Sequence, residues 1–589
     1  MGINVGPFQT VTALYNKPGA DFECVLTPVN LIASCTVRVL GGDYSVDWGD
    51  GVFVDYSSGN ASAVPTGDIT VKSSNEVTYF AATTNTYSEI NITALGTLTA
   101  LNNTFRNLSA MTAFSITGSE VVTTFNGTWF GCSGLTSFPL IDTSASTTFA
   151  NAWTGCSGLT SFPAIDTSAG TNFSSAWRNC SGLTSFPLID TSAATFFATA
   201  WRGCSSLTSF PAINTSLATS LSSAWRDCSS LTSFPPLNFS SSTSFSFAWY
   251  GCSGLTSFPS VNVAAGTSFN NAWRNCTGLT SFPALDMSAG TDLFEAWRGC
   301  TGLTSFSVVT IGAASIDSAW HTCSGLTSFP ALDLSSVTLA DDAWRGCSSL
   351  TSFLVIDMGA CLSVNSAWFG CSSLTSFPAI DLGLCTNFAS AWNNLSSLTS
   401  FGLIDSSSGE NFGNAWNGCS GLTSFPAIDT SAATVLGSAW RNCSGLTSFP
   451  ALSTGACTSF SNTWNGCSGI TSFPALDLSA GVTFTGALQG CTGMTSFAPT
   501  DLSSGVTFTL MFATCSALTS LGDLVTEGPT SQVFTSMFQS CSALVTIGAI
   551  DTTGTIGASS NMFTGCSAMT SPDSTARNDL ADASGADFN

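Results

Sequence analysis

The sequence predicts an α/β solenoid of about 20 coils, preceded by a small all-β sandwich. Two observations carry this prediction. One segment recurs every 24 residues, with a slip to 23 between Trp297 and Trp320. Ahead of it, the chain has a different texture of short alternating segments. We therefore expect a sandwich domain for attachment or capping at 1–88, a solenoid at 89–572, and an acidic tail or cap at 573–589.

The repeated segment is typified by residues 151–166, Asn-Ala-Trp-Thr-Gly-Cys-Ser-Gly-Leu-Thr-Ser-Phe-Pro-Ala-Ile-Asp. Its tryptophan, which we call the anchor, marks one residue per coil. The anchors are Trp129, Trp153, Trp177, Trp201, Trp225, Trp249, Trp273, Trp297, Trp320, Trp344, Trp368, Trp392, Trp416, Trp440 and Trp464. Phe105 begins the series, and Leu488, Phe512, Phe538 and Phe563 continue it.

Each coil is expected to have a helical side, a strand side and a polar return. Phe149, Ala152, Trp153 and Cys156 have the spacing of one face of a short helical turn. The following Leu-Thr-Ser-Phe at 159–162 is rich in β-formers and stacks in register with its copies, so we expect a strand there. One coil buries too little apolar surface to fold alone. The stability must therefore come from stacking.

The residues before the array alternate apolar and polar side chains between Gly, Asn and Ser, as in an antiparallel sandwich. The clearest such segments are Thr36–Leu40, Tyr44–Trp48 and Ile69–Lys72. Val46–Gly51 resembles the Trp-Gly-Asp-Gly turn of PKD-like β-sandwich modules. We interpret Gly49 and Gly51 as tight-turn residues and expect Asp50 to cap the turn.

Composition excludes several classes of protein. Only 8% of the residues are charged and the net charge is -23, which argues against nucleic-acid binding. Mean hydropathy is +0.32, yet no run of 18 apolar residues occurs, so we expect no membrane insertion. The first residues, Met1–Phe8, lack the basic and apolar regions of a secretory signal. An extracellular protein is expected, on a virion surface rather than a cell surface.

Eighteen of the 23 cysteines fall three residues after an anchor. Leucine replaces cysteine at 108 and 395, which indicates an apolar site. We expect a column of buried thiols, since one Cys per coil without a His cannot build a zinc site. No cofactor or metal is predicted. Two pairs remain open as disulfides, Cys24 with Cys35 and Cys361 with Cys385.

An Asp or Asn recurs four residues after the strand Phe. Stacked carboxylates would repel by roughly 0.9 kcal/mol per pair even in water. We expect Asx-type hydrogen bonds to the following turn to compensate, with a Ca²⁺ ladder as the alternative. The column comprises Asp142, Asp166, Asp190, Asn214, Asn238, Asn262, Asp286, Asp333, Asp357, Asp381, Asp405, Asp429, Asp477 and Asp501.

Arginine recurs one position after the anchor, and every arginine between residues 107 and 576 lies there. The arginine column, as we call it, comprises Arg178, Arg202, Arg226, Tyr250, Arg274, Arg298, His321, Arg345, Phe369 and Arg441. A solvated ridge is one interpretation. Because Arg and aromatic residues are enriched at recognition surfaces, a stripe that binds a glycan or a protein is the other.

Acidic residues outside the Asp column cluster beside the only histidine, His321. If Glu295 and Asp317 lie on adjacent coils, their carboxylates would have the separation of a retaining glycosidase. The cluster also contains Asp292, Asp341 and Asp342. Catalytic motifs are otherwise lacking, so we expect no enzyme activity; a polysaccharide depolymerase using Glu295 is the alternative.

The repeats resemble those of the BspA-like leucine-rich-repeat surface proteins, which read aromatic, two variable residues, Cys, Ser, Ser, Leu, Thr. The match is clear in Ala-Trp-Arg-Gly-Cys-Ser-Ser-Leu-Thr-Ser-Phe at 200–210 and in Met511–Leu521. It covers about 99–572. The resemblance implies a leucine-rich-repeat-like superhelix used for adhesion. Trp in place of Phe at the anchor, and Phe-Pro after the strand, depart from the usual unit.

Together these features predict a non-enzymatic structural adhesin, a virion fibre or receptor-binding protein that presents the solenoid to host-surface glycans or proteins. The sandwich would bind other virion or fibre subunits, and homo-oligomers remain open. A microbial cell-surface or extracellular-matrix fibre protein is the second hypothesis.

Overall fold

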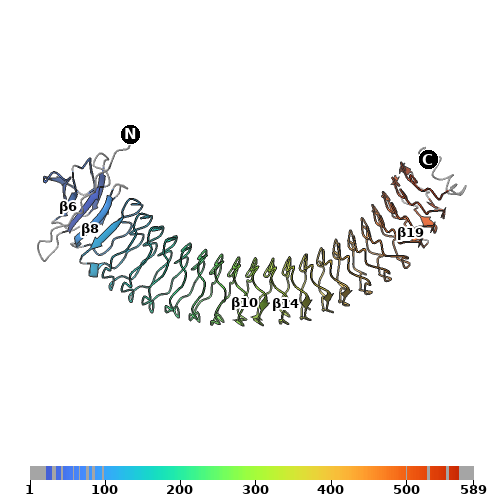
Figure 1. Cartoon of the computed structure of the whole chain (residues 1–589), viewed down its shortest axis with the longest axis horizontal. Helices are drawn as coiled ribbons and strands as arrows, with labels where there is room; N and C mark the ends of the chain where they lie inside the picture. Colours follow the sequence, from blue (N-terminus) through green and yellow to red (C-terminus); the bar gives the residue numbers. More distant parts are fainter. Residues whose placement is uncertain are drawn as a thin grey trace. The chain divides into compact units, whose positions relative to one another are not determined.

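The structure, a computed structural model, is shown in Figure 1. The residues that it describes are 22–28, 35–40, 44–57, 59–65, 67–73, 79–82, 87–95, 98–117, 119–498, 500–526, 531–548, 550–551 and 556–569. They belong to two compact units, Met1–Gly290 and Thr291–Asn589. The first unit holds the sandwich and the early coils, and the second holds the later coils. The expected tail at 573–589 lies outside the described residues.

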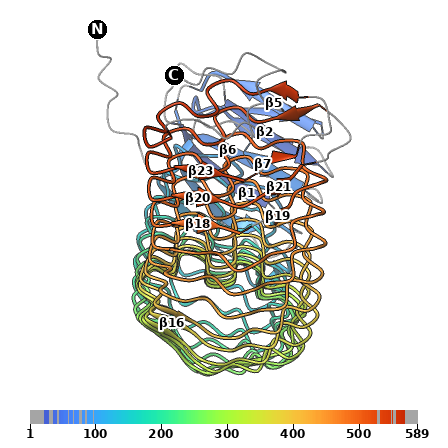
Figure 2. The same cartoon turned by 90° about the vertical axis from the view of Figure 1, so that its right-hand side faces the viewer.

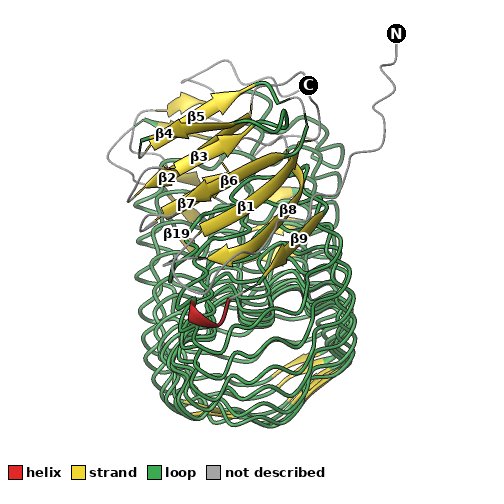
Figure 3. Cartoon of the chain, turned by 90° about the vertical axis from the view of Figure 1, so that its left-hand side faces the viewer, coloured by secondary structure: helices red, strands yellow, loops and turns green. Residues whose placement is uncertain are grey.

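The sandwich consists of two antiparallel sheets at the start of the first unit (Figure 3). Its strands are β1 (Phe22–Pro28), β2 (Cys35–Leu40), β3 (Tyr44–Asp47), β4 (Phe53–Tyr56), β5 (Gly59–Ala63), β6 (Ile69–Ser73), β7 (Tyr79–Ala82) and β8 (Tyr87–Leu95). One sheet has the order β5-β2-β7. The other has the order β4-β3-β6-β1-β8 and adds β9 (Ala113–Ile116) in parallel beside β8. Through β8 and β9, the sandwich sheet continues directly into the coils.

The β3–β4 connection has the expected tight turn but a different cap. Gly49 and Gly51 adopt φ of 95° and 81°, values that favour glycine. The carboxylate of Asp47 accepts the N–H groups of Gly49, Asp50 and Gly51 at 2.8 to 3.1 Å. Asp50, the expected cap, accepts only the N–H of Val52, at 2.9 Å. Asp47 therefore organises most of the turn.

The coils form a β-solenoid of about 19 turns, which confirms the solenoid prediction. Parallel bridges join equivalent residues of successive coils, 24 residues apart in most cases. In the first unit the bridged positions run from Ala100 to Ser281, and in the second from Asp292 to Val533. The bridge from Asp292 to Ser315 spans the 23-residue coil. The slip is therefore absorbed without breaking the stack.

The strand side is confirmed, although its strands have two or three residues. Ser328 and Phe329 pair in register with Ser352 and Phe353 of the next coil. Figure 2 shows β18, β20 and β23 above one another, and β19 beside β21. The coil strands are β10 (Ser281–Phe282), β11 (Asp286–Met287), β12 (Ser305–Phe306), β13 (Thr310–Ile311), β14 (Ser328–Phe329), β15 (Ser352–Phe353), β16 (Ser376–Phe377), β17 (Ser400–Phe401), β18 (Ser496–Phe497), β19 (Thr500–Asp501), β20 (Ser520–Leu521), β21 (Leu524–Val525), β22 (Gln532–Val533), β23 (Thr546–Ile547), β24 (Ile550–Asp551) and β25 (Ile556–Ala558).

The predicted helical side is not helical. Among the described residues the one helix is a 3-10 turn, η1 (Ser119–Val121), and none is long and apolar enough to span a membrane. In the segment expected to be helical, Asn151 and Gly155 have φ of 57° and 78°, which an α-helix does not allow. A chain of tight turns forms instead. Such turns also return a side chain inward every three or four residues, so they share the apolar spacing of a helix.

The backbone of these turns alternates between two kinds of hydrogen bond. The N–H groups of Trp153 and Gly155 donate to carbonyls of the next coil, at 2.8 and 2.7 Å. Between them, the N–H groups of Thr154 and Cys156 donate three residues back within the coil, at 3.2 and 3.1 Å. Half of the donors therefore fix the local turn, and the other half fix the register between coils.

The interior is a continuous aromatic column within each unit. The ring of Trp249 stacks on Trp225 at 5.6 Å and on Trp273 at 5.4 Å, and it meets the edge of Phe258 at 4.8 Å. The anchor rings are fully buried. The indole N–H of Trp249 is also buried and has no acceptor. Stacking and apolar burial therefore outweigh a lost hydrogen bond at this site.

These packing contacts predict how an anchor responds to truncation. Trp249→Ala should lower the free energy of unfolding by about 3–5 kcal/mol, because it leaves a large cavity in the stack. Trp249→Phe keeps a stacked ring and removes the unpartnered N–H, so the loss should be about 1 kcal/mol. Urea unfolding followed by circular dichroism measures both. Equal losses for the two variants would contradict a stability that depends on ring stacking.

Candidate binding surface

The arginine column lies where the turn segment meets solvent. Its side chains are half-buried from Arg178 to Phe369, whereas Arg441 is exposed. Backbone bonds hold neighbouring members in register, since the N–H groups of Gly155, Asn179 and Gly203 donate to the carbonyls of Arg178, Arg202 and Arg226 at 2.6 to 2.7 Å. Successive side chains of the column therefore emerge from successive coils.

Three consecutive arginines in the first unit lack an acidic partner at the preceding turn. The side chains of Arg178 and Arg202 make no hydrogen bond or ion pair with the described residues, and the Nε of Arg178 is buried without an acceptor. Burial, followed by the charges of Arg226 and Arg178, lowers the pKa of Arg202. Each neighbouring pair of cations repels by about 0.8 kcal/mol at one coil's separation in water.

Aromatic rings orient the third of these arginines. The guanidinium carbon of Arg226 lies 4.5 Å from the ring centre of Tyr250 and 5.2 Å from that of Phe247. Its Nε is 3.3 Å from the carboxylate of Asp227. On the other side of Tyr250, the guanidinium of Arg274 lies 5.7 Å from the same ring. Tyr250 therefore stacks between two cations and restricts both.

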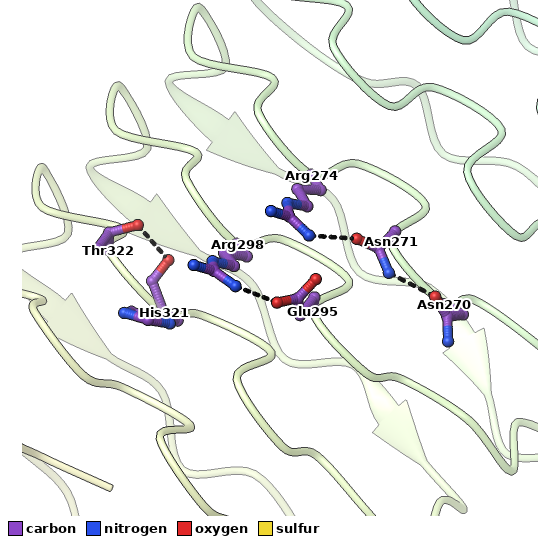
Figure 4. A network of polar contacts seen from close by, with 7 residues as sticks. All are labelled: Asn270, Asn271, Arg274, Glu295, Arg298, His321 and Thr322. Atoms are coloured by element: carbon purple, nitrogen blue, oxygen red, sulfur yellow. Dashed lines mark hydrogen bonds and ion pairs between the residues drawn. The ribbon is translucent and has the colours of Figure 1, made fainter. Parts of the chain in front are cut away.

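In the second unit, two arginines of the column are ion-paired. Arg298 bonds to Glu295, as Figure 4 shows, and Arg345 bonds to Asp342 at 3.0 Å. The guanidinium of Arg345 also lies 4.4 Å from the ring of Phe369. These arginines are structurally compensated, so the column is not uniform along its length.

The difference arises from the residue three positions before each arginine, a set that the sequence patterns did not single out. This position has a left-handed backbone, and its side chain reaches the arginine. Asn103 accepts from Arg106 at 3.0 Å. Asn271 accepts from Arg274 at 3.0 Å (Figure 4), as the acidic residues do in the second unit. Before Arg178, Arg202 and Arg226 the position holds Ser175, Thr199 and Ser223. The i, i+3 spacing was the available signal.

The hydroxyls at two of these positions have other partners. The side-chain oxygens of Ser175 and Thr199 lie 2.5 Å apart, within hydrogen-bond distance of each other, and the Thr199 hydroxyl also donates to the carbonyl of Ala198 at 2.7 Å. Being uncharged, these hydroxyls do not neutralise a guanidinium.

The acidic cluster of the second unit is engaged in structural contacts. Glu295 is almost fully buried and pairs with Arg298. Asp317 accepts the backbone N–H of Asp341 from the next coil at 2.9 Å, and burial raises the pKa of Asp317. Asp341 in turn accepts the N–H of Asn365 at 2.8 Å. The carboxylates of Asp317 and Asp341 therefore connect neighbouring coils through hydrogen bonds.

His321 lies on the coil between the two ion pairs of the second unit. It is half-buried and its Nδ1 has no acceptor or donor. Burial and then the charge of Arg298 lower the pKa of His321, so the imidazole is neutral at pH 7. Its carbonyl accepts the hydroxyl of Thr322 at 2.7 Å (Figure 4).

The Asp column forms the Asx turns that the sequence predicts. The carboxylates of Asp142 and Asp190 each accept the N–H two residues later, at 2.9 Å, and Asn214 does the same at 3.0 Å. The backbone N–H and the side chain of Ser144 lower the pKa of Asp142, and Ser192 acts likewise on Asp190. Among the described residues, no cluster of His, Cys, Asp and Glu is arranged to hold a metal ion.

The cysteines of the repeat are free and buried, as predicted. Each thiol donates to the carbonyl of the preceding anchor; Cys204, for example, lies 3.2 Å from the carbonyl of Trp177. Burial raises the pKa of Cys204 to about 12, so the thiolate is not populated at neutral pH. Cys361 and Cys385 are free thiols. The side chain of Cys35 lies outside the described residues.

A second polar column was missed by the sequence patterns. After each Asp turn, one residue points inward, and in several coils it is a buried Thr or Ser. Thr191 and Thr215 donate to the carbonyls of Asn214 and Asn238 in the next coil, both at 2.6 Å. Other coils place Phe239 or another apolar residue there. A hydroxyl is tolerated inside because it always finds this carbonyl.

The comparisons with known proteins agree with the repeat pattern. A family model described as "BspA type Leucine rich repeat region" matches in 6 copies, over residues 76–207 and 173–294. This confirms the predicted resemblance. A search of curated proteins gives no match.

Solved structures align with much of this chain at low identity and low TM-score. The "TLR13-ssRNA13 complex" aligns over 81% of this chain and 72% of the other, with 16% identity and a TM-score of 0.22. The functional domain of InlJ from Listeria monocytogenes aligns over 69% and 71%, with 12% identity and a TM-score of 0.15. A leucine rich cell surface protein from Faecalibacterium prausnitzii aligns over 70% and 86%, with 16% identity and a TM-score of 0.13.

The Asp turns predict a loss of stability in acid. A carboxylate whose pKa is lowered by folding contributes stability above its unfolded pKa and loses it as the pH falls through the folded pKa. Thermal unfolding should therefore occur at lower temperature as the pH drops below about 5. Replacing Asp142, Asp190 and Asp429 together by Asn should flatten this dependence of the melting temperature on pH. Asn already occupies the equivalent position at residues 214, 238 and 262. A wild-type melting temperature that rises in acid would mean that repulsion along the column dominates.

The two ion pairs of the second unit predict a ranking by burial. The side chain of Glu295 is 7% exposed, whereas that of Asp342 is 32% exposed. Glu295→Gln should cost about 1–3 kcal/mol of unfolding free energy, with screening at the half-exposed Arg298 limiting the loss. The isosteric control Asp342→Asn should cost about 0–1 kcal/mol. Denaturant titration of both variants decides, and the reverse order would contradict the assignment of Glu295 as a structural partner.

Proposed function

Since the repeats at 76–294 are of the BspA leucine-rich type, we propose that this chain is a non-enzymatic adhesin that presents its arginine column to surface glycans or proteins. The observation that carries the proposal is the run of half-buried Arg and Tyr side chains held in register on successive coils. Side chains that are ordered before binding lose little entropy when a ligand arrives. Arginine and tyrosine are also the residues that recognition surfaces favour.

The sandwich is suited to attachment. Its six-stranded sheet includes β8 and passes without a break into β9 of the first coil. A force applied to the coils is therefore transmitted through backbone hydrogen bonds, not through a linker. Such a joint supports the finer proposal, a virion fibre or receptor-binding protein anchored by the sandwich. An extracellular or surface location follows from this role.

The geometry supports binding over hydrolysis. A retaining glycosidase needs two carboxylates free to face one glycosidic bond. Here the Glu295 carboxylate bonds to Arg298, and that of Asp317 accepts a backbone N–H. A carboxylate held in an ion pair with a guanidinium carries no proton that it could give to a leaving group. The depolymerase hypothesis is therefore the weaker one.

A blocking experiment tests the adhesin proposal. The purified full chain should inhibit attachment of the particle or cell that carries it to its host surface, in a dose-dependent way. Heat-unfolded chain at the same concentration is the matched control. Undiminished attachment at saturating chain would contradict the proposal. Loss of polysaccharide length during incubation, absent in Glu295→Gln, would instead establish the depolymerase.

Immunogold electron microscopy separates the two settings for an adhesin. An antibody against the coils should label projections of virions if the finer proposal holds. Labelling confined to cell envelopes or to extracellular matrix would establish the microbial surface protein, and labelling of cytoplasm alone would contradict both.

A further inference from the structure

The three consecutive arginines of the first unit form a cationic ladder in a chain of net charge -23, and its one printed ion pair joins Arg226 to Asp227 at 3.3 Å. Elsewhere in the column, Arg106 and Arg274 bond to Asn, and Arg298 and Arg345 to Glu or Asp. Only the ladder residues Arg178, Arg202 and Arg226 combine three neighbouring charges with Ser or Thr three positions earlier. Folding therefore leaves these guanidiniums without the amide or carboxylate acceptor that their equivalents have at that position.

The ladder has a fixed pitch. The anchors beside it, Trp177, Trp201 and Trp225, stack at 5.5 and 5.6 Å with their rings within 6° of parallel. The carbonyls of the three arginines accept inter-coil hydrogen bonds, so the backbone of the ladder repeats once per coil at the same interval. This interval is comparable to the length of one sugar residue in an extended polysaccharide. A linear polymer with a regular spacing of anionic groups would match it, whereas a folded protein surface would do so only by coincidence.

We propose that Arg178, Arg202 and Arg226 form a binding site for an anionic polysaccharide, which runs along the stacked coils and places carboxylate or sulfate groups against successive guanidiniums. The proposal rests on the adhesin function and names its ligand class. Tyr250 closes one end by stacking on Arg226, and buried Thr154 precedes the other. Planar guanidiniums bind carboxylate and sulfate oxygens through paired hydrogen bonds.

Asp227 sets the strength of the site. Its carboxylate lies 3.3 Å from the Nε of Arg226 and competes with any anionic ligand there. Removing this charge should therefore strengthen binding. The affinity can also be adjusted at position 199, three residues before Arg202. Thr199 has φ of 58°, close to the 54° of Asp342, so an Asp at 199 can pair with Arg202 as Asp342 pairs with Arg345.

The test measures binding of the full chain to heparin, which is sulfated, to polygalacturonate, which carries carboxylates, and to neutral dextran. We expect salt-sensitive binding to at least one of the two anionic polymers and none to dextran. The preferred polymer identifies the anionic group. Arg202→Gln should weaken binding by about tenfold or more.

Matched variants separate charge from shape. Thr199→Asp should weaken binding about as much as Arg202→Gln while every arginine remains, and Thr199→Asn should change it less than about twofold. Asp227→Asn should tighten it. The melting temperatures of all variants show whether a loss of binding reflects unfolding. If Arg202→Gln unfolds, the comparison of Thr199→Asp with Thr199→Asn tests the proposal.

Two outcomes would overturn the proposal. One is an absence of binding to both anionic polymers, or binding that Arg202→Gln and Thr199→Asp leave unchanged. The other is tighter binding to single-stranded DNA than to either polysaccharide, which would assign the ladder to nucleic acid. Inhibition of host attachment by Arg202→Gln chain as strong as wild type would refute this site and leave the adhesin proposal standing. Retained polysaccharide binding without any inhibition of attachment would refute the adhesin proposal and leave this site standing.

Discussion

Register between coils is the constraint on which the rest of the structure depends. It is fixed by backbone N–H groups that donate to the following coil, at 2.8 Å for Trp153 and 2.7 Å for Gly155. Once these bonds form, the anchors must stack, the thiols must lie under the carbonyls of the preceding coil, and the residue after each anchor must repeat along the surface. The anchors contribute the burial that offsets the ordering entropy, but the backbone decides what lies above what.

The sequence predicts those features that depend on periodicity alone. The 24-residue repeat is enough to predict the solenoid, the anchor column around Trp153, and the buried thiol column. The Asx turns follow because Asp142 and Asn214 share a position, and only local hydrogen bonding suits both residue types. The helical side failed for a physical reason. Apolar spacing reports which residues face inward, and a chain of tight turns satisfies the same spacing as a helix.

The division of the arginine column could not be predicted from the column itself. Arg202 and Arg345 occupy equivalent positions and have the same neighbours in the motif. Their environments differ because the left-handed residue three positions earlier is Thr199 in one coil and Asp342 in the other. Pairing across a left-handed turn depends on where the side chain points, and that direction emerges only from the backbone conformation.

The cationic ladder has an energetic consequence for the folded chain. Arg178, Arg202 and Arg226 are brought together by folding and kept apart in the unfolded chain, so their repulsion of about 0.8 kcal/mol per neighbouring pair opposes folding. A ligand that neutralises them binds the folded state alone and therefore stabilises it by mass action. Arg298 and Arg345 have no such deficit, because Glu295 and Asp342 already supply the charge. Binding energy and folding energy are thus coupled at the ladder and independent at the paired arginines.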